Sequence, residues 1–564
     1  MRESVMGNKP LVVQGVQCCT LSVLMTTLAI HMLSLALPIM TLQVYDRVLP
    51  HHTTHTLEIL IIGVCIAIAL EAVLKVSRAY VIGWTGAAFE HRLSCELVEH
   101  TLAADLKHLK REGIGADLQR LTAASKLKGF YNGELFATFL EGVFVVIFIA
   151  LIWYIAGALV LVPLTILALF SVLTIHLGKH LKEYLDVRNY CDDNRYNFLV
   201  QALAGVHTIK ASGLEQIFRR RYEFMEQQSG LSNLLVARSS SSAFNSGAVF
   251  SHMMVAAVIT FGALQVIDNK MTVGALVACI LLAGRIMQPV QKILQVWVRS
   301  QDFDLTQKQV KQVLDTPTIA RPKTAKPIAQ KGHVGLEDVC FRYDDNAPWM
   351  LERISLEIKP GETIHITGHE GAGKSTLLKI IAGIYKPDQG SVAIDGHSLP
   401  SLSTKVLSRH VAYLSDTNSI FRGTIRDNLT RFGMVSGDEA LKISNELSIQ
   451  EDIARLPAGF DTNLEGTIAD SIPPGLKQRI LIARALAQQP RIILFDNADR
   501  ALDRQSFKAF RDYLKQRQPD VAMIIISDDA EMVALAQKHY LLYEGQLIEQ
   551  KAENLEIPTE EVRL

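Results

Sequence analysis

The second half of the chain contains the stretch Gly368-His369-Glu370-Gly371-Ala372-Gly373-Lys374-Ser375-Thr376. It fits the pattern G-x-x-x-x-G-K-[ST], in which a glycine-rich loop curves around the phosphates of a nucleotide. Glycines let backbone N–H groups turn inward because no Cβ is in the way. The pattern predicts that Lys374 reaches the β- and γ-phosphates and that the hydroxyl of Ser375 binds Mg²⁺. The glycines concerned are Gly368, Gly371 and Gly373.

The residues on either side of this loop predict a strand before it and a helix after it. Residues 361–367 form an apolar run typical of a buried strand, and residues 375–382 are typical of a helix. A further strand is predicted over residues 333–341, and another over residues 492–495, directly before Asp496. This order indicates an α/β domain that binds a nucleoside triphosphate. Hydrolysis of that nucleotide is a separate question.

Composition separates the chain into two parts. The 564 residues are 49% hydrophobic, and the mean hydropathy is +0.19. The apolar residues concentrate before about residue 300, whereas the later part has the composition of a soluble domain. With 57 basic and 57 acidic residues, nothing favours nucleic acid as a partner. The seven cysteines show no metal-ligand spacing and indicate a reduced set.

Six apolar runs are long enough to cross a bilayer, which takes about 17–25 residues. They are residues 21–42, 57–78, 135–154, 157–177, 247–267 and 274–296. The first run is too long for the core of a signal peptide, so we expect it to be retained as a span.

Basic residues predict the orientation of these spans. Lys and Arg are concentrated in the connections 83–134 and 178–243, whereas the opposite side carries little beyond Arg47 and Lys270. By the positive-inside rule, both termini are then cytoplasmic. The two basic connections also have helical periodicity, so we expect the spans to continue as long helices with turns near 113–115 and 209–213. The ends of such helices are natural contact points for a cytoplasmic domain.

A few ionisable residues lie within or beside the spans. Glu71 and Lys75 are four residues apart, a spacing that fits either a mutually neutralised pair or the lining of a water-filled pathway. Arg285, within the sixth run, is a candidate for a residue that faces a water-filled cavity. Histidines at 51, 52 and 55 are expected to lie in a solvated outer loop rather than in a metal site.

The sequence therefore predicts a multi-pass α-helical membrane domain followed by an α/β nucleotide-binding domain. The membrane domain covers residues 1–300, including its cytoplasmic helical extensions. A polar linker that contains Pro317, Pro322 and Pro327 covers residues 301–332. The nucleotide-binding domain covers residues 333–564.

Six spans followed by this domain resemble an ATP-binding-cassette half-transporter of the exporter type. The stretch from Leu37 to Pro50, Leu-Pro-Ile-Met-Thr-Leu-Gln-Val-Tyr-Asp-Arg-Val-Leu-Pro, is similar to the first outer loop of type I secretion permease/ATPases. That resemblance implies a dimer whose cassettes meet head to tail, each ATP lying between one subunit's phosphate loop and the other's signature sequence. Some relatives carry an N-terminal peptidase domain. The early first span leaves no room for one here, so we expect no leader-peptide cleavage.

Several motifs of the family can be located residue by residue. The resemblance places Tyr343 where an aromatic ring stacks on adenine and Asp496 where Mg²⁺ is held. Arg500–Asp503 resembles the loop that contacts the opposite subunit, and residues 478–486 match the helix after the signature. The residues implied in ATP and Mg²⁺ binding are Tyr343, Gly368, Gly371, Gly373, Lys374, Ser375, Thr376 and Asp496.

Four other positions depart from the family pattern. Asn497 replaces the glutamate that polarises the attacking water, and Asp528 replaces the switch histidine beside the γ-phosphate. Asp416 replaces the glutamine that links nucleotide to the membrane domain, and it could help retain Mg²⁺. The signature Leu-Ser-Gly-Gly-Gln is here Ile472-Pro-Pro-Gly-Leu476, so two prolines remove backbone N–H groups from the helix end that grips phosphate. No catalytic residue of the family is intact.

These departures lead us to expect an ATP-binding exporter subunit with impaired hydrolysis, paired with a consensus half-transporter. The resemblance implies polypeptide cargo moved outward across the bacterial inner membrane, with a periplasmic adaptor and an outer-membrane channel as further partners. Two alternatives stay open. One is a homodimeric exporter that hydrolyses slowly, and the other is a non-hydrolysing membrane scaffold or regulator.

Overall fold

The structure is a computed structural model that describes residues 20–109, 124–125, 127–128, 134–319, 321–322, 331–464 and 472–550. It divides into two compact units. A helical unit comprises residues 1–102 and 112–316, and a cassette unit comprises residues 103–111 and 317–564. The predicted fold class, a helical membrane domain followed by an α/β cassette domain, is confirmed.

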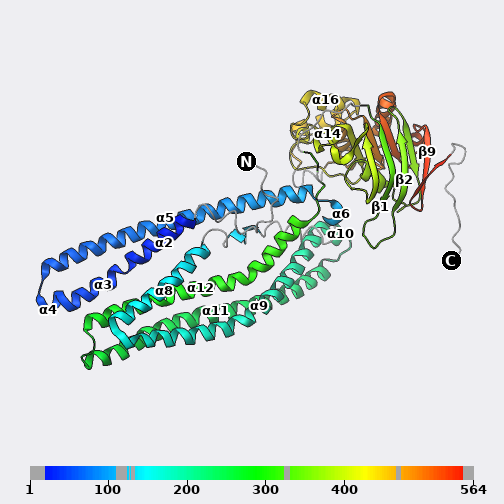
Figure 1. Cartoon of the computed structure of the whole chain (residues 1–564). Coiled ribbons are helices and arrows are strands. Elements are labelled where there is room, and N and C mark those ends of the chain that lie inside the picture. Colours follow the sequence, from blue (N-terminus) through cyan, green and yellow to red (C-terminus); the bar gives the residue numbers. More distant parts are fainter. Residues whose placement is uncertain are drawn as a thin grey trace, which may run out of the picture. The chain divides into compact units, whose positions relative to one another are not determined.

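The helical unit consists of long helices that pack side by side (Figure 1). Short helical segments at α4 (Leu49–His51) and α10 (Val206–Ala211) join some of them. The long elements are α2 (Thr20–Ser34), α3 (Ala36–Gln43), α5 (Thr54–Ala103), α8 (Glu134–Ala156), α9 (Leu161–Ala204), α11 (Glu215–Ile267) and α12 (Val273–Asp315).

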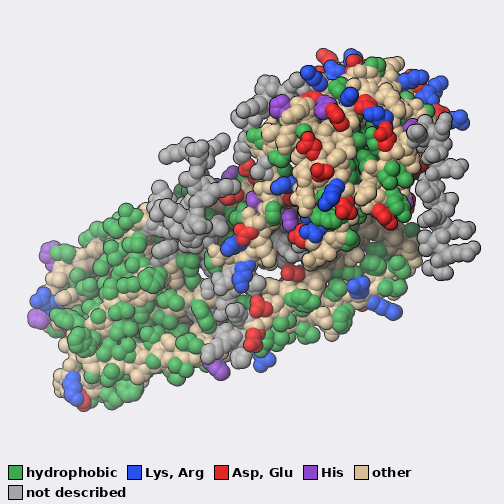
Figure 2. All heavy atoms as spheres, turned by 45° about the vertical axis from the view of Figure 1, so that its right-hand side comes forward, with side chains coloured by type: hydrophobic (Ala, Val, Ile, Leu, Met, Phe, Trp, Pro, Cys, Tyr) green, Lys and Arg blue, Asp and Glu red, His purple; other side chains and the backbone are tan. Residues whose placement is uncertain are grey.

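Within the described residues, five stretches are long and apolar enough to cross a membrane: Leu21–His51, Thr54–Ala103, Ala137–His176, Glu215–Ile267 and Val273–Ile293. The third contains two of the predicted spans. Its helix is interrupted by the 3₁₀ turn Gly157–Val160, where Gly157 has a φ of 56°. At about 1.5 Å per residue, the whole stretch is about twice the thickness of a bilayer core. Figure 2 shows the visible face of this unit covered mainly by hydrophobic side chains, as expected for helices that face lipid.

The predicted helical extensions beyond the spans are present. The turn predicted at 209–213 is found between α10 and α11, where Gly213 has a φ of 64°. The turn predicted at 113–115 lies outside the described residues. Helix α12 continues to Asp315, so the first half of the region predicted as linker is helical. This part of α12 still carries an apolar face, because Val310 and Val313 are buried in one cluster with Leu93 and Leu97 of α5.

One carboxylate joins the stretch 37–50 to the beginning of α12. Asp46 lies in the π-helix Val44–Val48. Its Oδ1 accepts a hydrogen bond from Gly274 N at 3.1 Å, and its Oδ2 accepts one from the Thr272 hydroxyl at 2.8 Å. A Cβ at Gly274 would lie 2.4 Å from Asp46 Oδ1, so only glycine fits there. Asp46 thus satisfies an otherwise unpaired N–H at a helix N-terminus.

Replacing Asp46 with alanine is expected to lower the free energy of unfolding of the helical unit by about 1–3 kcal/mol, because a partly buried N–H and a hydroxyl lose their acceptor. The measurement is the midpoint of thermal unfolding of the full chain in nanodiscs. Asp268→Ala is the matched control, because the ion pair described for Asp268 is the exposed one with Lys270 in its own loop. Equal midpoints for the two variants would contradict the assigned role of Asp46.

The cassette unit is built on two sheets. The six-stranded sheet has the order β10-β9-β3-β8-β7-β6 and is parallel except for β10, and the four-stranded antiparallel sheet has the order β2-β1-β4-β5. The strands are β1 (Val334–Phe341), β2 (Leu351–Ile358), β3 (Thr363–Thr367), β4 (Gln389–Ile394), β5 (His397–Ser398), β6 (Val411–Ser415), β7 (Ile492–Asp496), β8 (Ala522–Ile526), β9 (Lys538–Tyr543) and β10 (Gln546–Gln550). The helices that matter below are α13 (Lys374–Ile381), α19 (Pro474–Leu486), α20 (Arg504–Arg517) and α21 (Ala530–Val533).

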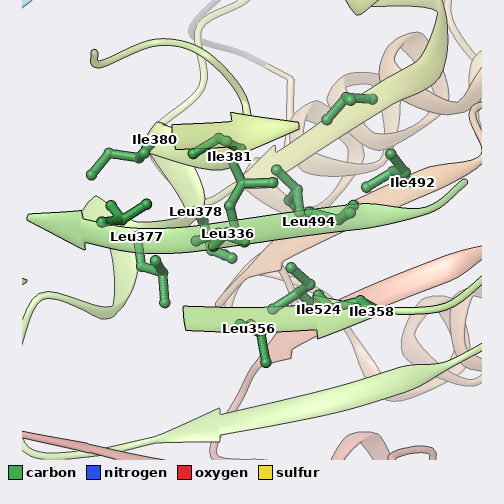
Figure 3. Close-up of a cluster of buried hydrophobic side chains, with 14 of the residues drawn as sticks. Leu336, Leu356, Ile358, Leu377, Leu378, Ile380, Ile381, Ile492, Leu494 and Ile524 are labelled. Atoms are coloured by element: carbon green, nitrogen blue, oxygen red, sulfur yellow. The ribbon is translucent and has the colours of Figure 1, made fainter. Parts of the chain in front are cut away.

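The core of this unit packs around α13 and the two sheets. Strands β7 and β8 are buried at every position, which is typical of central parallel strands covered on both faces. Figure 3 shows side chains of β1, β2, α13, β7 and β8 converging on one cluster, including Leu336, Leu378 and Ile524. This packing fixes the carboxyl ends of the central strands, where the phosphate loop begins.

A short segment from the first half of the chain belongs to the cassette unit. Helix α6 (Leu106–Leu109) follows Asp105, whose N–H donates to Pro317 O at 2.9 Å. The ammonium of Lys107 lies 2.7 Å from a carboxylate oxygen of Asp388 and 3.3 Å from one of Asp345. Only 6% of the Lys107 side chain is exposed, and Leu106 packs against the cassette core. This segment comes from a connection between spans, where a contact with the cytoplasmic domain was predicted.

Candidate nucleotide-binding site

The phosphate loop lies between β3 and α13, as predicted. Gly368 has a φ of 153° and Gly373 one of 101°, conformations that L-residues rarely adopt. A Cβ at Gly368 would lie 2.5 Å from the backbone oxygen of Leu542, on neighbouring strand β9. Gly373 is the N-cap of α13, so the N–H groups of the first helical turn point toward the loop. The loop therefore presents backbone donors at a helix N-terminus, the usual site for phosphate.

The side chain of Lys374 folds back onto the phosphate loop. Its Nζ donates to Gly368 O at 2.6 Å and to His369 O at 3.0 Å. Burial lowers the pKa of the Lys374 ammonium, an effect that the nearby carboxylates of Asp528 and Glu370 oppose. Because this ammonium is partly desolvated, its electrostatic attraction to a phosphate is stronger than that of an exposed lysine.

A serine hydroxyl and a carboxylate meet next to the loop, where Mg²⁺ was predicted. Ser375 Oγ donates to Asp496 Oδ1 at 2.9 Å, and the phenol of Tyr413 donates to Asp496 Oδ2 at 2.7 Å. Burial raises the pKa of Tyr413, so it stays a donor that orients this carboxylate. Oxygen ligands of this kind suit Mg²⁺.

The rest of the coordination shell would have to come from phosphate and water. Among the described residues, no group of three or more His, Cys, Asp or Glu side chains could hold a metal ion by itself. Sparse protein ligation is usual for Mg²⁺ at nucleotide sites, so the residues present fit the ion. Ser375 and Asp496 are the ligands that we predict.

Tyr343 lies beside the beginning of α13. Its hydroxyl and Thr376 Oγ1 are 2.7 Å apart and hydrogen-bonded. The ring is half-exposed and meets the rings of Phe341 and Tyr385 edge to face, with centroids 5.2 and 5.8 Å away. Edge contacts leave a ring face available for stacking. This geometry suits the predicted role of Tyr343 against adenine, which stays a prediction.

The departing residues lie along the same edge of the sheet as the loop. Asp416, Asn497 and Asp528 follow the parallel strands β6, β7 and β8, whose carboxyl ends face the same way as that of β3. Asn497 has a φ of 49°, a conformation that asparagine tolerates well, and its N–H donates to Ile526 O. Asp528 Oδ2 lies 3.2 Å from a guanidinium nitrogen of Arg500. Asp416 accepts a 3.4 Å hydrogen bond from Ser415 Oγ.

The altered signature forms the beginning of a helix. Helix α19 starts at Pro474 with Pro473 as its N-cap, and proline is well suited to the first helical position because its missing N–H has no partner there anyway. The N–H of Lys477 already bonds to Pro473 O at 3.0 Å. Gly475 and Leu476 therefore hold the N–H groups of the first turn left for an anion. Residues 465–471, just before the signature, lie outside the described residues.

Two buried side chains near the site were not singled out from the sequence. Gln478 donates to Ser415 O at 3.2 Å and to Ala498 O at 3.0 Å, which joins α19 to the ends of β6 and β7. His365, on β3, bonds through Nε2 to Ser527 O at 3.2 Å. Both roles depend on contacts between distant segments. A polar residue inside the otherwise apolar run of β3 is a sequence signal that could have identified His365, whereas Gln478 lies among other polar residues of α19 and has no such signal.

His365 makes the stability of the cassette depend on pH. Burial lowers the pKa of His365 below its ordinary value of 6.5, although the bond to Ser527 O partly offsets this. Because the folded pKa is the lower one, the contribution of neutral His365 is present above about pH 6.5 and is lost as the pH falls below it. Each unit of difference between the folded and unfolded pKa is worth about 1.4 kcal/mol.

We therefore expect the midpoint of thermal unfolding to drop between about pH 7.5 and pH 5.5, and to drop less in His365→Gln, which keeps a donor but cannot be charged. His397→Gln, at an exposed position, is the control and should keep the wild-type pH dependence. An unchanged pH dependence in His365→Gln would show that other groups cause it.

Comparison with known proteins agrees with this arrangement. The chain matches the family model for the ABC transporter transmembrane region over residues 20–290 and the model for the ABC transporter over residues 351–500. It is 30% identical to the cyclolysin secretion/processing ATP-binding protein CyaB of Bordetella pertussis, over 93% of this chain and 74% of that protein. It is 27% identical, with the same coverage, to the leukotoxin export ATP-binding protein LtxB of Aggregatibacter actinomycetemcomitans.

The fold is similar to that of a solved bacterial Atm1-family ABC exporter with ATP bound. The TM-score is 0.81 at 20% identity, and 94% of each chain is covered. Together with the phosphate loop and the membrane helices described above, these matches identify the family. The chain belongs to the ATP-binding-cassette exporters, as a half-transporter homologous to the type I secretion permease/ATPases.

Proposed function

We propose that this chain is an exporter subunit that binds ATP as a clamp and has little hydrolysis of its own. The observation that carries the proposal is the combination of an intact phosphate-binding half-site with Asn497 next to Asp496. An amide cannot accept a proton from water, and the loss of a positioned general base typically costs about 10²–10⁴ in rate. ATP would hold two cassettes together without being turned over at this site.

The other departures support the same proposal. Asp528 puts a carboxylate where a neutral or cationic donor would help a γ-phosphate, and this carboxylate is paired with Arg500. The signature end of α19 offers fewer N–H groups to the nucleotide of an opposite subunit, since Pro473 and Pro474 have none. Composite sites made from two such chains would therefore lack a general base and part of the backbone N–H donors that bind the γ-phosphate.

Exporters of this family work as dimers, so these features favour a partner subunit with consensus motifs. In such a heterodimer, one composite site would combine this chain's phosphate loop and Asn497 with a consensus signature. The other would combine the partner's phosphate loop with the altered signature of this chain. The secretion functions named for the two relatives support polypeptide cargo moved outward across the bacterial inner membrane. We further propose that both termini are cytoplasmic and that a periplasmic adaptor and an outer-membrane channel complete the pathway.

A homodimeric exporter with slow hydrolysis is the second candidate. The N–H groups of Gly475 and Leu476 support it, because α19 keeps part of the donor set and the positive end of its helix dipole. In that case Asp416 or Asp528 could compensate by retaining Mg²⁺. Mg²⁺ titrations of ATP binding that are unchanged in Asp416→Asn and Asp528→Asn would remove this compensation from consideration.

The test is to measure bound nucleotide and phosphate release in one sample of the purified chain in lipid nanodiscs. Stoichiometric ATP binding without turnover supports the clamp, and co-purification from the native membrane should then bring down a consensus half-transporter. Sustained turnover by the chain alone would overturn the proposal in favour of the homodimer. Absence of nucleotide binding would overturn both.

A further inference from the structure

Three helices of the membrane unit share one buried carboxylate. Glu141, on α8, is 5% exposed. Its Oε1 lies 3.2 Å from a guanidinium nitrogen of Arg78 on α5, and its Oε2 lies 2.7 Å from the ammonium of Lys292 on α12. Arg78 also donates to Thr27 Oγ1 at 3.3 Å, which adds the first span to the group. Two cations from different helices thus converge on a single acid.

This charged group lines a cavity of about 390 Å³. Lys75 also lines the cavity, and its ammonium lies 2.6 Å from a carboxylate oxygen of Glu71, so both interpretations of the sequence spacing fit. That pair is neutral. Arg78 and Lys292 have only Glu141 between them among the charged residues described at the cavity, so one positive charge is left uncompensated. Lys292 is 48% exposed and is the more accessible of the two.

The excess of positive charge around a shielded carboxylate calls for an explanation. Charged side chains beside the apolar stretches of a membrane protein usually face water, and here they face one cavity together. A purely structural ion pair would need one cation for Glu141. The second cation, half-exposed to the cavity, makes the site attractive to an anion, and the guanidinium fork of Arg78 is well suited to a carboxylate.

The position of the group along the helices indicates where such an anion would come from. Lys292 precedes the last residue of the apolar stretch Val273–Ile293, whereas Glu141 lies near the beginning of Ala137–His176. Arg78 is about 36 Å along α5 from Thr54, roughly one bilayer core. All three residues therefore lie near the same face of the membrane. In the proposed orientation this is the cytoplasmic face, at which cargo enters.

We propose that this cavity binds a carboxylate side chain of the transported polypeptide, and so favours acidic segments of the cargo at the entrance of the membrane domain. The inference rests on the proposed export of polypeptides. Arg78 and Lys292 supply the charge, and the hydroxyl of Thr138, which also lines the cavity, can supply a further hydrogen bond. An anionic lipid headgroup would offer similar chemistry, but the shielded position of Glu141 and Arg78 among three helices favours a side chain.

The test measures the affinity of the full chain, in phosphatidylcholine nanodiscs without nucleotide, for two short fluorescent peptides. One alternates glutamate with glycine, and the other has glutamine in place of glutamate. We expect the acidic peptide to bind at least about tenfold more tightly, and Lys292→Gln to remove about tenfold or more of its affinity, which is the effect of losing one charge-assisted hydrogen bond. Equal affinities for both peptides, or an unchanged affinity in Lys292→Gln, would overturn the proposal.

Controls separate the cavity from general electrostatics and from folding. Lys270→Gln removes one positive charge from an outer loop, where Lys270 pairs with Asp268, and should leave the affinity unchanged. Lys292→Arg keeps the charge and should restore most of the binding. Phosphatidylglycerol is then tested as a ligand of both variants. If its affinity is the same for the wild type and for Lys292→Gln, the lipid does not bind at Lys292, and the cavity is a peptide site. Loss of phosphatidylglycerol binding in Lys292→Gln would assign the cavity to lipid instead.

Failure of this test can be told apart from failure of the proposed function. Peptide binding is read without ATP, so a negative result leaves the nucleotide clamp untouched. A chain that fails to bind ATP would leave the peptide measurement intact.

Discussion

Lys374→Ala is expected to weaken ATP binding by about 10²–10⁴-fold. The variant lacks the ammonium and therefore two charge-assisted hydrogen bonds to phosphate, each worth about 1.5–3 kcal/mol. The loop itself should keep its shape, since its conformation is set by Gly368, Gly373 and the end of β3. The measurement is equilibrium binding of a fluorescent ATP analogue to the full chain in nanodiscs. Thermal unfolding in the absence of nucleotide should change little.

Lys379→Ala is the matched control for this prediction. Lys379 lies in the last turn of the same helix, α13, so its removal changes the net charge equally but away from the loop. It should retain wild-type affinity. A similar loss in both variants would mean that general charge, rather than the phosphate loop, determines binding.

Restoring the consensus residues is expected to raise ATP hydrolysis by about 10²–10⁴-fold, the usual contribution of a positioned base. The variant combines Asn497→Glu and Asp528→His with Pro473→Ser and Pro474→Gly. The first pair returns the base and the switch residue, and the second returns backbone N–H groups and a hydroxyl to the beginning of α19. Phosphate release by the chain alone is the measurement.

Asn497→Glu alone should raise turnover far less, because the signature facing each nucleotide would still be altered. It should also cost about 1–2 kcal/mol of stability, since residue 497 has a left-handed backbone that glutamate tolerates less well than asparagine. Full activity in this single variant would show that Pro473 and Pro474 do not impair the signature.

Contiguous features were predictable from the sequence. The phosphate loop, β3 and α13 were located to within about two residues, because each glycine and each apolar position meets a local requirement. The membrane helices followed from apolar runs for the same reason. The pairing of Glu71 with Lys75 was also foreseen as one of two interpretations, since four residues make one helical turn.

Contacts between distant segments could not be predicted in this way. Glu141, Arg78 and Lys292 come from three helices, and nothing in the order of the chain indicates that they meet. Arg285 lies within an apolar run, and among the described residues it forms no ion pair. The roles of Tyr413 and Gln478 likewise depend on the order of strands in the sheet, which residue patterns alone leave open.

The cassette is discontinuous in sequence, because the segment from Ala103 to Leu109 folds with residues 317–550. A fragment that begins at residue 333 would lack a piece of its own folding unit. It would leave Asp388 and Asp345 without Lys107 and would uncover the core next to Leu106. Exchanging cassettes between half-transporters therefore requires two cuts in the first half of the chain as well as one near residue 317.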